Sequence, residues 1–375
     1  MSHLFTPLEL RSLTLPNRIV VSPMCQYSAV EGRVQPWHHA HLGSLALSGA
    51  GMLIVEATAV EPAGRITPGC VGLYDDATEQ ALAGLVRALR SVSPVPLAIQ
   101  IGHAGRKASS GRPWEGGRLI PASAGGWTPV GPSAAPITVD EPPPHALSLA
   151  ELDALKERFV QATLRADRLG FDAIEVHGAH GYLLHQFLSP IANKRTDLYG
   201  GSLENRMRWP LEVFEAMRSA WPAHKPLGMR ISATDWRNDL PAGERWDTPD
   251  AIVFAQKCEK IGADWIDVSS GGVSPLQKIT LGPGYQVPFA EAVRKEVRIP
   301  VMAVGLITEP RQAEEILAGG KADMVALARG LLWNPRWPWH AAAELDGTVD
   351  APRQYWRSQP RDFKALFGQT TFGQR

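Results

Sequence analysis

The sequence predicts an α/β fold, a (β/α)8 TIM barrel formed by a single domain over residues 1–375. Short apolar runs alternate with amphipathic segments almost from end to end, which indicates parallel strands joined by helices. Eight such runs occur, the number that closes a barrel of this type. The residues after the first run, 22–27, lack the GxGxxG pattern of an open dinucleotide-binding sheet.

The expected elements follow the apolar pattern in chain order. The first three strands are separated by helices and lead into a long irregular segment. Ser148 and Glu151 then form a capping box, Leu152 and Leu155 continue at helical spacing, and Gly170 ends that helix. The expected strands are 18–22, 52–57, 97–101, 173–176, 227–231, 265–268, 301–304 and 324–327, and the expected helices are 37–48, 79–92, 149–169, 203–220, 249–261, 289–297, 309–318 and 339–345.

Two segments lie outside the repeating pattern. Residues 102–147, after the third strand, are rich in Gly, Pro and Ser and are expected to form an inserted capping loop. Trp114 and Trp127 favour a packed loop. Residues 347–375 form a C-terminal tail beyond the barrel. Trp236 and Trp246, after the fifth strand, are interpreted as lid or surface residues.

Composition limits the classes of partner. Lys+Arg and Asp+Glu each number 38, so the formal net charge is 38 − 38 = 0, which argues against nucleic acid or an anionic membrane surface as partner. The three cysteines form no CxxC pair or disulfide framework. No apolar run approaches the roughly 20 residues that span a bilayer, and the first residues do not form a signal peptide. A cytoplasmic protein is expected.

The residues that follow the strands should form the site, because this end of a TIM barrel carries the chemistry. His177, His180 and Tyr182 follow the fourth strand, so two imidazoles and a phenol can bind one oxygen and supply one proton. A metal site is not expected, since no Asp or Glu lies at ligand spacing to the two histidines. His103 and His185 are interpreted as structural.

Other residues at the strand ends favour a bound cofactor. They are mostly neutral hydrogen-bonding groups, without a lysine for a Schiff base or a nucleophile elbow, so a cofactor is expected to perform the chemistry. Gly305 and Arg329 follow the last two strands, where barrels often bind phosphate. An isomerase or lyase acting on a sugar phosphate would use the same cradle, and this alternative stays open.

The chain resembles the old yellow enzyme family of FMN-dependent ene-reductases, in particular its thermophilic-like bacterial subclass. The segment His-Gly-Ala-His-Gly-Tyr at 177–182 is part of the resemblance, which extends over nearly the whole barrel. The matching stretches are 4–8, 17–19, 22–27, 100–106, 175–190, 193–206, 304–308 and 354–357.

The resemblance implies which residues hold FMN. One group would line the flavin ring, with Cys25 tuning its potential and Arg230 facing its N1/O2 edge. Another would hold the phosphate, although Ala328 stands where the family commonly has glycine. The implied cofactor residues are Pro23, Met24, Cys25, Ala57, Gln100, Arg230, Gly305, Ala328 and Arg329.

The resemblance also implies an activity and an assembly. NADPH or NADH would reduce the flavin, and an α,β-unsaturated carbonyl or nitro compound would then be reduced in a ping-pong cycle. His177 and His180 would bind the substrate oxygen, Tyr182 would donate the proton, and Tyr27 and Arg357 would contact substrate. Arg357 lies on the tail, which would reach the neighbouring site of a homodimer or homotetramer. Reduction of xenobiotic nitro compounds or nitrate esters is an alternative on the same fold.

Overall fold

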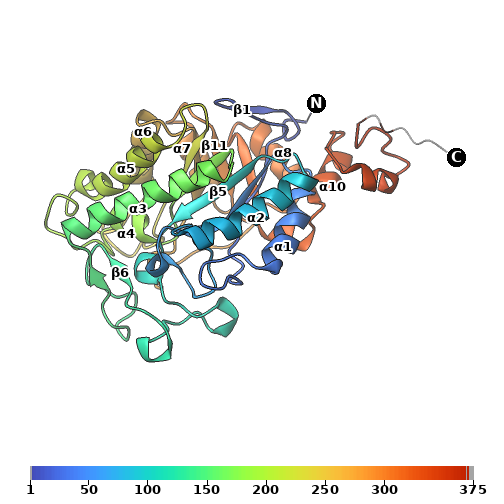
Figure 1. Ribbon diagram of the computed structural model, residues 1–375. Coiled ribbons are helices and arrows are strands. Elements are labelled where there is room, and N and C mark those ends of the chain that lie inside the picture. Colours follow the sequence, from blue (N-terminus) through green and yellow to red (C-terminus); the bar gives the residue numbers. More distant parts are fainter. Residues whose placement is uncertain (1, 369, 371–375) are drawn as a thin grey trace.

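The computed structural model describes residues 2–368 and 370, so the last part of the expected tail, 369 and 371–375, lies outside the described residues. Eight parallel strands close into a barrel in the order β10-β11-β12-β3-β4-β5-β8-β9, as the sequence predicts (Figure 1). The strands are apolar runs because both faces are covered. Their bounds are β3 Ile19–Val21, β4 Met52–Ala59, β5 Leu97–Gly102, β8 Ala173–Gly178, β9 Leu227–Ser232, β10 Trp265–Ser269, β11 Val301–Val304 and β12 Met324–Leu327.

Helices surround the barrel, and the expected ones are confirmed with ends that differ by up to three residues. The capping box is present: the Ser148 hydroxyl accepts from the Glu151 amide at 3.3 Å, and the Glu151 carboxylate accepts from the Ser148 amide at 2.7 Å. The helix bounds are α1 Pro36–Ala46, α2 Asp76–Val92, α3 Leu149–Arg168, α5 Leu203–Ala220, α6 Thr248–Lys260, α7 Val287–Arg294, α8 Pro310–Ala318 and α10 Trp337–Glu344.

The sequence did not reveal several short elements. The hairpin β1 Leu8–Leu10 and β2 Leu13–Leu15 has strands too short to show a clear alternation. Helix α4, Leu183–Leu188, is buried on all sides and therefore has no amphipathic period. Helix α9, Arg329–Trp333, also went unpredicted. One interpretation is wrong: Trp246 is fully buried and donates from Nε1 to the Ser232 carbonyl, so it is neither a lid nor a surface residue.

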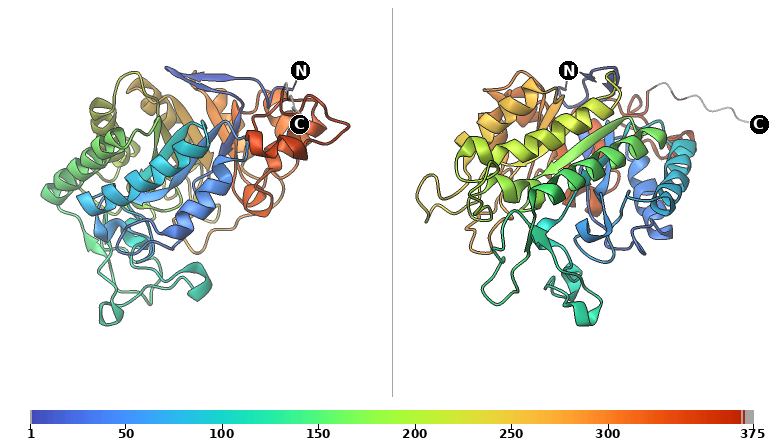
Figure 2. Two further views of the ribbon diagram at one scale, coloured as in Figure 1. Left: turned by 45° about the vertical axis from the view of Figure 1, so that its right-hand side comes forward. Right: turned by 60° about the vertical axis from the view of Figure 1, so that its left-hand side comes forward.

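The insert and the tail lie at opposite ends of the barrel (Figures 1 and 2). The insert follows β5 and contains the short pair β6 Val130–Gly131 and β7 His145–Ala146. Trp127 anchors it by donating to the Ala63 carbonyl at 2.9 Å, as packing predicts, whereas Trp114 is exposed. The tail borders a hollow with segments that precede β4 and β5, including 47–50 and 94–96. It therefore lies away from the ends of the strands that carry the site.

No helix in the described part of the chain is long and apolar enough to cross a membrane.

Candidate active site

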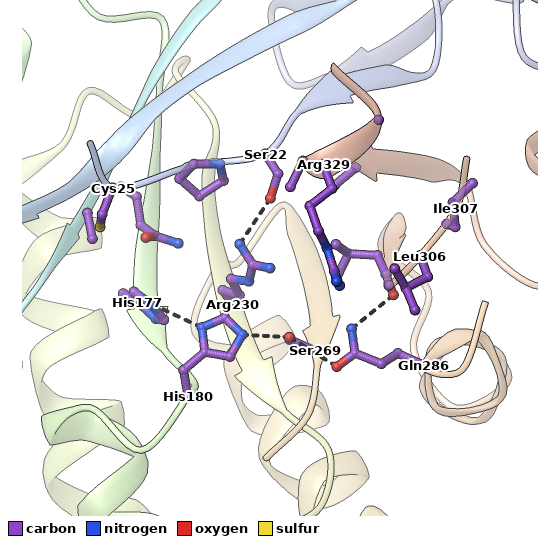
Figure 3. Close-up of a pocket in the computed structure, with 18 of the residues that line it drawn as sticks. Ser22, Cys25, His177, His180, Arg230, Ser269, Gln286, Leu306, Ile307 and Arg329 are labelled. Carbon is purple, nitrogen blue, oxygen red and sulfur yellow. Dashed lines mark hydrogen bonds between the residues drawn. The ribbon is translucent and has the colours of Figure 1, made fainter. Parts of the chain in front are cut away.

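A cavity of about 300 Å³ opens at the C-terminal ends of the barrel strands (Figure 3). It brings together nearly all of the residues predicted from the sequence, from strands that are far apart in the chain. Its lining comprises Ser22, Pro23, Cys25, Tyr27, Ala57, Gln100, His177, His180, Tyr182, Arg230, Ser269, Tyr285, Gln286, Val304, Gly305, Leu306, Ile307, Thr308, Ala326, Ala328, Arg329 and Gly330.

The two histidines converge on one point of the cavity. His177 is the second-to-last residue of β8, and its Nδ1 accepts from the Ala179 amide at 3.3 Å, so the proton of the neutral ring is on Nε2. Nε2 faces Nδ1 of His180 at 3.4 Å. The Ser269 hydroxyl donates to Gln286 Oε1 at 3.3 Å, so it accepts from Nε2 of His180 at 2.6 Å, and Nδ1 of His180 accepts from Nε2 of His177. The Nε2–H of His177 and the Nδ1 edge of His180 thus meet at one place, where a bound oxygen would accept from His177, and also from His180 once the His180 proton moves to Nδ1, as in an oxyanion hole.

Both imidazoles are neutral at physiological pH. Burial, followed by the nearby Arg230 charge, holds the pKa of His177 and of His180 well below its usual value. Neutral rings donate one hydrogen each and leave no charge to be compensated in the buried site. Among the described residues, no group of three or more His, Cys, Asp or Glu side chains is placed to hold a metal ion.

Backbone geometry fixes the position of His180. It has a φ of 58°, and Gly181, which follows, has a φ of 71°. A Cβ on Gly181 would lie 2.1 Å from the Gly272 carbonyl oxygen, and a Cβ on Gly272 would lie 2.3 Å from the His180 carbonyl carbon. Only glycine allows these two loops to cross so closely. The glycines that flank the histidines in the sequence therefore place the His180 ring against Ser269.

Tyr182 stands beside the histidines and is held as a neutral phenol. Its ring centroid is 4.9 Å from that of His177 in an edge-on arrangement, and Lys107 Nζ lies 5.0 Å from its ring centroid. Burial raises the pKa of the Tyr182 phenol well above its usual value. Lys107 donates to the His180 and Gly272 carbonyls, and burial lowers its pKa to about 8. Tyr182 thus keeps its proton at neutral and mildly alkaline pH.

The wall next to β3 and β4 contains Cys25 and Tyr27. Hydrogen bonding to Cys70 and burial raise the pKa of Cys25 well above its usual value, so the side chain is a thiol. Burial likewise raises the pKa of the Tyr27 phenol. The Tyr27 ring meets Trp114 of the insert edge-on, with centroids 5.8 Å apart. The insert therefore reaches the rim of the cavity.

The opposite wall is formed by the loops after β11 and β12. Gly305 has a φ of 123°, and a Cβ there would come within 2.7 Å of Gln286 Nε2. Arg329 begins α9, is exposed, and forms no ion pair with any residue that the structure describes. Glycine and arginine in this arrangement leave backbone amides and one cation free for an anionic group.

Two predicted residues lie outside the cavity. The Met24 side chain does not line it and packs against the main hydrophobic core. Arg357 lies in the short helix Arg353–Ser358 of the tail, at the other end of the barrel. Sequence reasoning in turn missed Lys107, Tyr285 and Gln286. Gln286 accepts from Ser270 at 2.6 Å and donates to the Val304 carbonyl, but no motif or period marks this residue.

The sequence and the fold both match known flavoproteins. The family model described as "NADH:flavin oxidoreductase / NADH oxidase family" matches residues 3–347. The chain belongs to this family. It is 43% identical over 356 residues to an NADPH dehydrogenase of Geobacillus thermodenitrificans, covering 94% of this chain and 98% of that protein. An NADPH dehydrogenase of Bacillus licheniformis is 44% identical over 357 residues, covering 95% and 98% of the two chains.

Solved structures agree with this assignment. Morphinone reductase superimposes with a TM-score of 0.74 at 28% identity, covering 96% of this chain and 93% of that chain. Its complex with tetrahydroNAD superimposes with a TM-score of 0.72. The resemblance to old yellow enzymes is confirmed, and the chain is an oxidoreductase with FMN as its cofactor and NAD(P)H as its electron donor. The sugar-phosphate isomerase or lyase that the sequence left open is thereby set aside.

Proposed function

We propose that this chain is an ene-reductase that reduces the activated C=C bond of α,β-unsaturated carbonyl or nitro compounds in a ping-pong cycle. One observation carries the proposal: two neutral imidazoles and one neutral phenol face a single point of the cavity. An oxygen bound there would accept two hydrogen bonds, and a proton would be available beside it.

The residues around the cavity suit FMN. Arg230 is 6% exposed, and a guanidinium at this depth can compensate the negative charge of a reduced ring edge. Gln100 offers an amide to the polar edge of the ring, while Pro23, Cys25 and Ala57 offer the face of a planar ligand apolar contact. Gly305, Ala328 and Arg329 are proposed to hold the phosphate, and the alanine keeps its backbone N–H for this purpose.

When bound, FMN supplies hydride transfer from NAD(P)H to the substrate. His177 and His180 bind the carbonyl or nitro oxygen and polarise the conjugated double bond, since their N–H groups stabilise the charge that develops on that oxygen. Tyr182 holds a proton beside the oxygen site and transfers it to the α-carbon. A phenol with a raised pKa is a weak acid, but the developing enolate is a strong enough base to take its proton.

Steady-state turnover with product analysis tests the proposal. Purified protein reconstituted with FMN should consume NADPH or NADH in step with an enone, and chromatography should identify the saturated product. Nicotinamide consumption with oxygen but with no enone or nitroalkene would contradict it. Nitrate esters and nitroaromatic compounds belong in the same panel, because the oxygen site would accept their oxygens as well.

We further propose that the tail acts in a neighbouring subunit of a homodimer or homotetramer. Arg357 and the cavity of its own chain are at opposite ends of the barrel, which supports a role for Arg357 at a second copy's site or none. Deleting the chain from Pro352 onward should change the oligomeric state, measured by light scattering, and weaken substrate binding. An unchanged mass together with an unchanged KM would refute this role.

A further inference from the structure

A cluster of four polar side chains lies inside the barrel below the cavity. Gln100, Glu175, Arg230 and Asp267 project from the adjacent strands β5, β8, β9 and β10, and none of them is more than 6% exposed. Their barrel surroundings are otherwise apolar, formed by residues such as Met302. Gln100 and Arg230 also line the cavity, so they connect its floor to the two carboxyl groups.

The contacts within the cluster leave three buried carboxyl oxygen atoms without a hydrogen-bond donor. Gln100 Nε2 donates to Glu175 Oε1 at 2.7 Å, and Arg230 Nε lies 3.2 Å from Asp267 Oδ2. Glu175 Oε2 and both oxygens of Asp267 have no hydrogen-bond partner of ordinary geometry. With both carboxyls ionised, the formal charge would be +1 − 2 = −1, buried and uncompensated, which is strongly unfavourable. One proton between the carboxyls makes the sum zero and gives the oxygens a donor.

We propose that Glu175 and Asp267 share one proton below the cavity, and that Glu175, acting through Arg230 as a positioning residue, takes up a proton at alkaline pH when bound FMN is reduced. The inference rests on the proposed placement of FMN in this cavity. A single residue, Arg230, lies between the carboxyl groups and the ligand, because it contacts Asp267 and also lines the cavity.

The direction of the protonation is set by the surroundings of each carboxyl. Burial, and then the charge of Asp267, raises the pKa of Glu175 to about 8. Burial also raises the pKa of Asp267, but Arg230 and a hydrogen bond from Glu175 oppose this, so Asp267 keeps the charge. The groups facing Glu175 are Gln100 from β5, Arg230 from β9, and Trp265 and Asp267 from β10. Glu175 is therefore protonated below pH 8 and loses its proton as the pH rises through that value.

Reduction of the cofactor changes this balance. Transfer of a hydride adds two electrons and one proton to the bound flavin, which leaves one additional negative charge next to Arg230. That charge competes for the cation and raises the pKa of Glu175 further. At a pH above 8, reduction thus binds one more proton, taken from solvent by the Glu175 carboxylate. Below pH 8 Glu175 is already protonated, and no additional proton is bound.

The midpoint potential of the bound FMN, measured from pH 6 to 10, tests this coupling. In the wild-type protein the pH dependence should steepen above pH 8 by one proton per two electrons. In Glu175→Gln the steepening should be absent. Gln is the matched replacement because its oxygen still accepts from Gln100 and its amide still donates to Asp267, so the fold is retained without the titrating proton. Potentials with the same steepening in both proteins would overturn the inference.

An infrared titration of the FMN-free protein gives a second readout. One component of the carbonyl-stretch band of protonated carboxylic acids should be present at pH 6, disappear around pH 8, and be missing in Glu175→Gln. Glu56 is a second buried carboxyl whose pKa burial raises, so Glu56→Gln serves as the control and should retain the band that titrates near pH 8. A protein that binds FMN but lacks this band would overturn the inference about Glu175 and leave the proposed function unaffected. A protein that binds no FMN would overturn both the inference and the proposed function.

Discussion

Replacing Tyr182 with Phe removes a proton donor and little else. The ring keeps its edge-on contact with His177 at 4.9 Å and its position 5.0 Å from Lys107 Nζ, so the packing of the site is preserved. General acid catalysis by one side chain typically contributes about 10²- to 10⁴-fold in rate, which corresponds to about 3–5 kcal/mol of barrier. We therefore expect alkene reduction to slow by that factor.

The two half-reactions separate this role from a general loss of activity. Stopped-flow absorbance should show reduction of the bound flavin by NADPH within about threefold of wild type, since that step needs no proton from Tyr182. Reoxidation by an enone should carry the whole loss. Because the pKa of Tyr182 is raised, its proton is present at all pH values below that pKa, and the wild-type reoxidation rate should not fall between pH 6 and 9 through loss of this acid. Tyr74→Phe is the control, since the Tyr74 hydroxyl binds the Glu31 carbonyl away from the cavity. Equal losses in both half-reactions of Tyr182→Phe would refute the assignment.

Three further predictions follow from the site. The double change His177→Ala and His180→Ala should weaken binding of a phenolic ligand by about 5- to 150-fold, which corresponds to the loss of two hydrogen bonds. The affinity of the wild-type protein should not change from pH 6 to 8, because the pKa values of both imidazoles are lowered. A change of affinity near pH 6.5 would contradict the neutral state of the rings. Arg329→Ala should weaken FMN binding by about 10- to 150-fold, which corresponds to the loss of one charged hydrogen bond. The unfolding temperature of the FMN-free protein should stay the same, because Arg329 is exposed. A lowered unfolding temperature would assign the residue a structural role instead. Gly181→Ala should destabilise the protein more than Gly243→Ala, because both glycines have positive φ but only Gly181 has a carbonyl oxygen 2.1 Å from the added Cβ. Denaturant unfolding measures the free energy of unfolding of both variants. Equal losses of this free energy would show that the close crossing of the two loops does not constrain residue 181.

The barrel was predictable because burial on both faces produces a signal in the sequence. Strands such as β11 and β12 are continuous apolar runs and were predicted to the residue. Glycine and capping signals placed the ends of α3. Helix α4 was not predictable, since its full burial removes the polar face from which an amphipathic helix is recognised.

The site was predictable where chemistry lies next to a strand end. His177, His180 and Tyr182 met this condition, and the fold brought them together as expected. Gln286 enters the cavity from the start of α7, far in the sequence from any strand end, and Glu175 is one residue of a buried strand until its neighbours in the barrel are known. Met24 packs against the hydrophobic core while its neighbours Pro23 and Cys25 line the cavity, a difference that residue type alone does not predict.

Anaerobic single turnover tests the central claim most directly. The FMN-loaded protein is reduced with one equivalent of NADPH, mixed with an excess of an enone such as cyclohexenone, and followed by flavin absorbance and product analysis. We predict that oxidised flavin returns with a rate that saturates in enone concentration and that one equivalent of the saturated ketone forms for each flavin. Flavin that NADPH reduces but that neither enones nor nitroalkenes reoxidise would contradict the assignment of this cavity to alkene reduction.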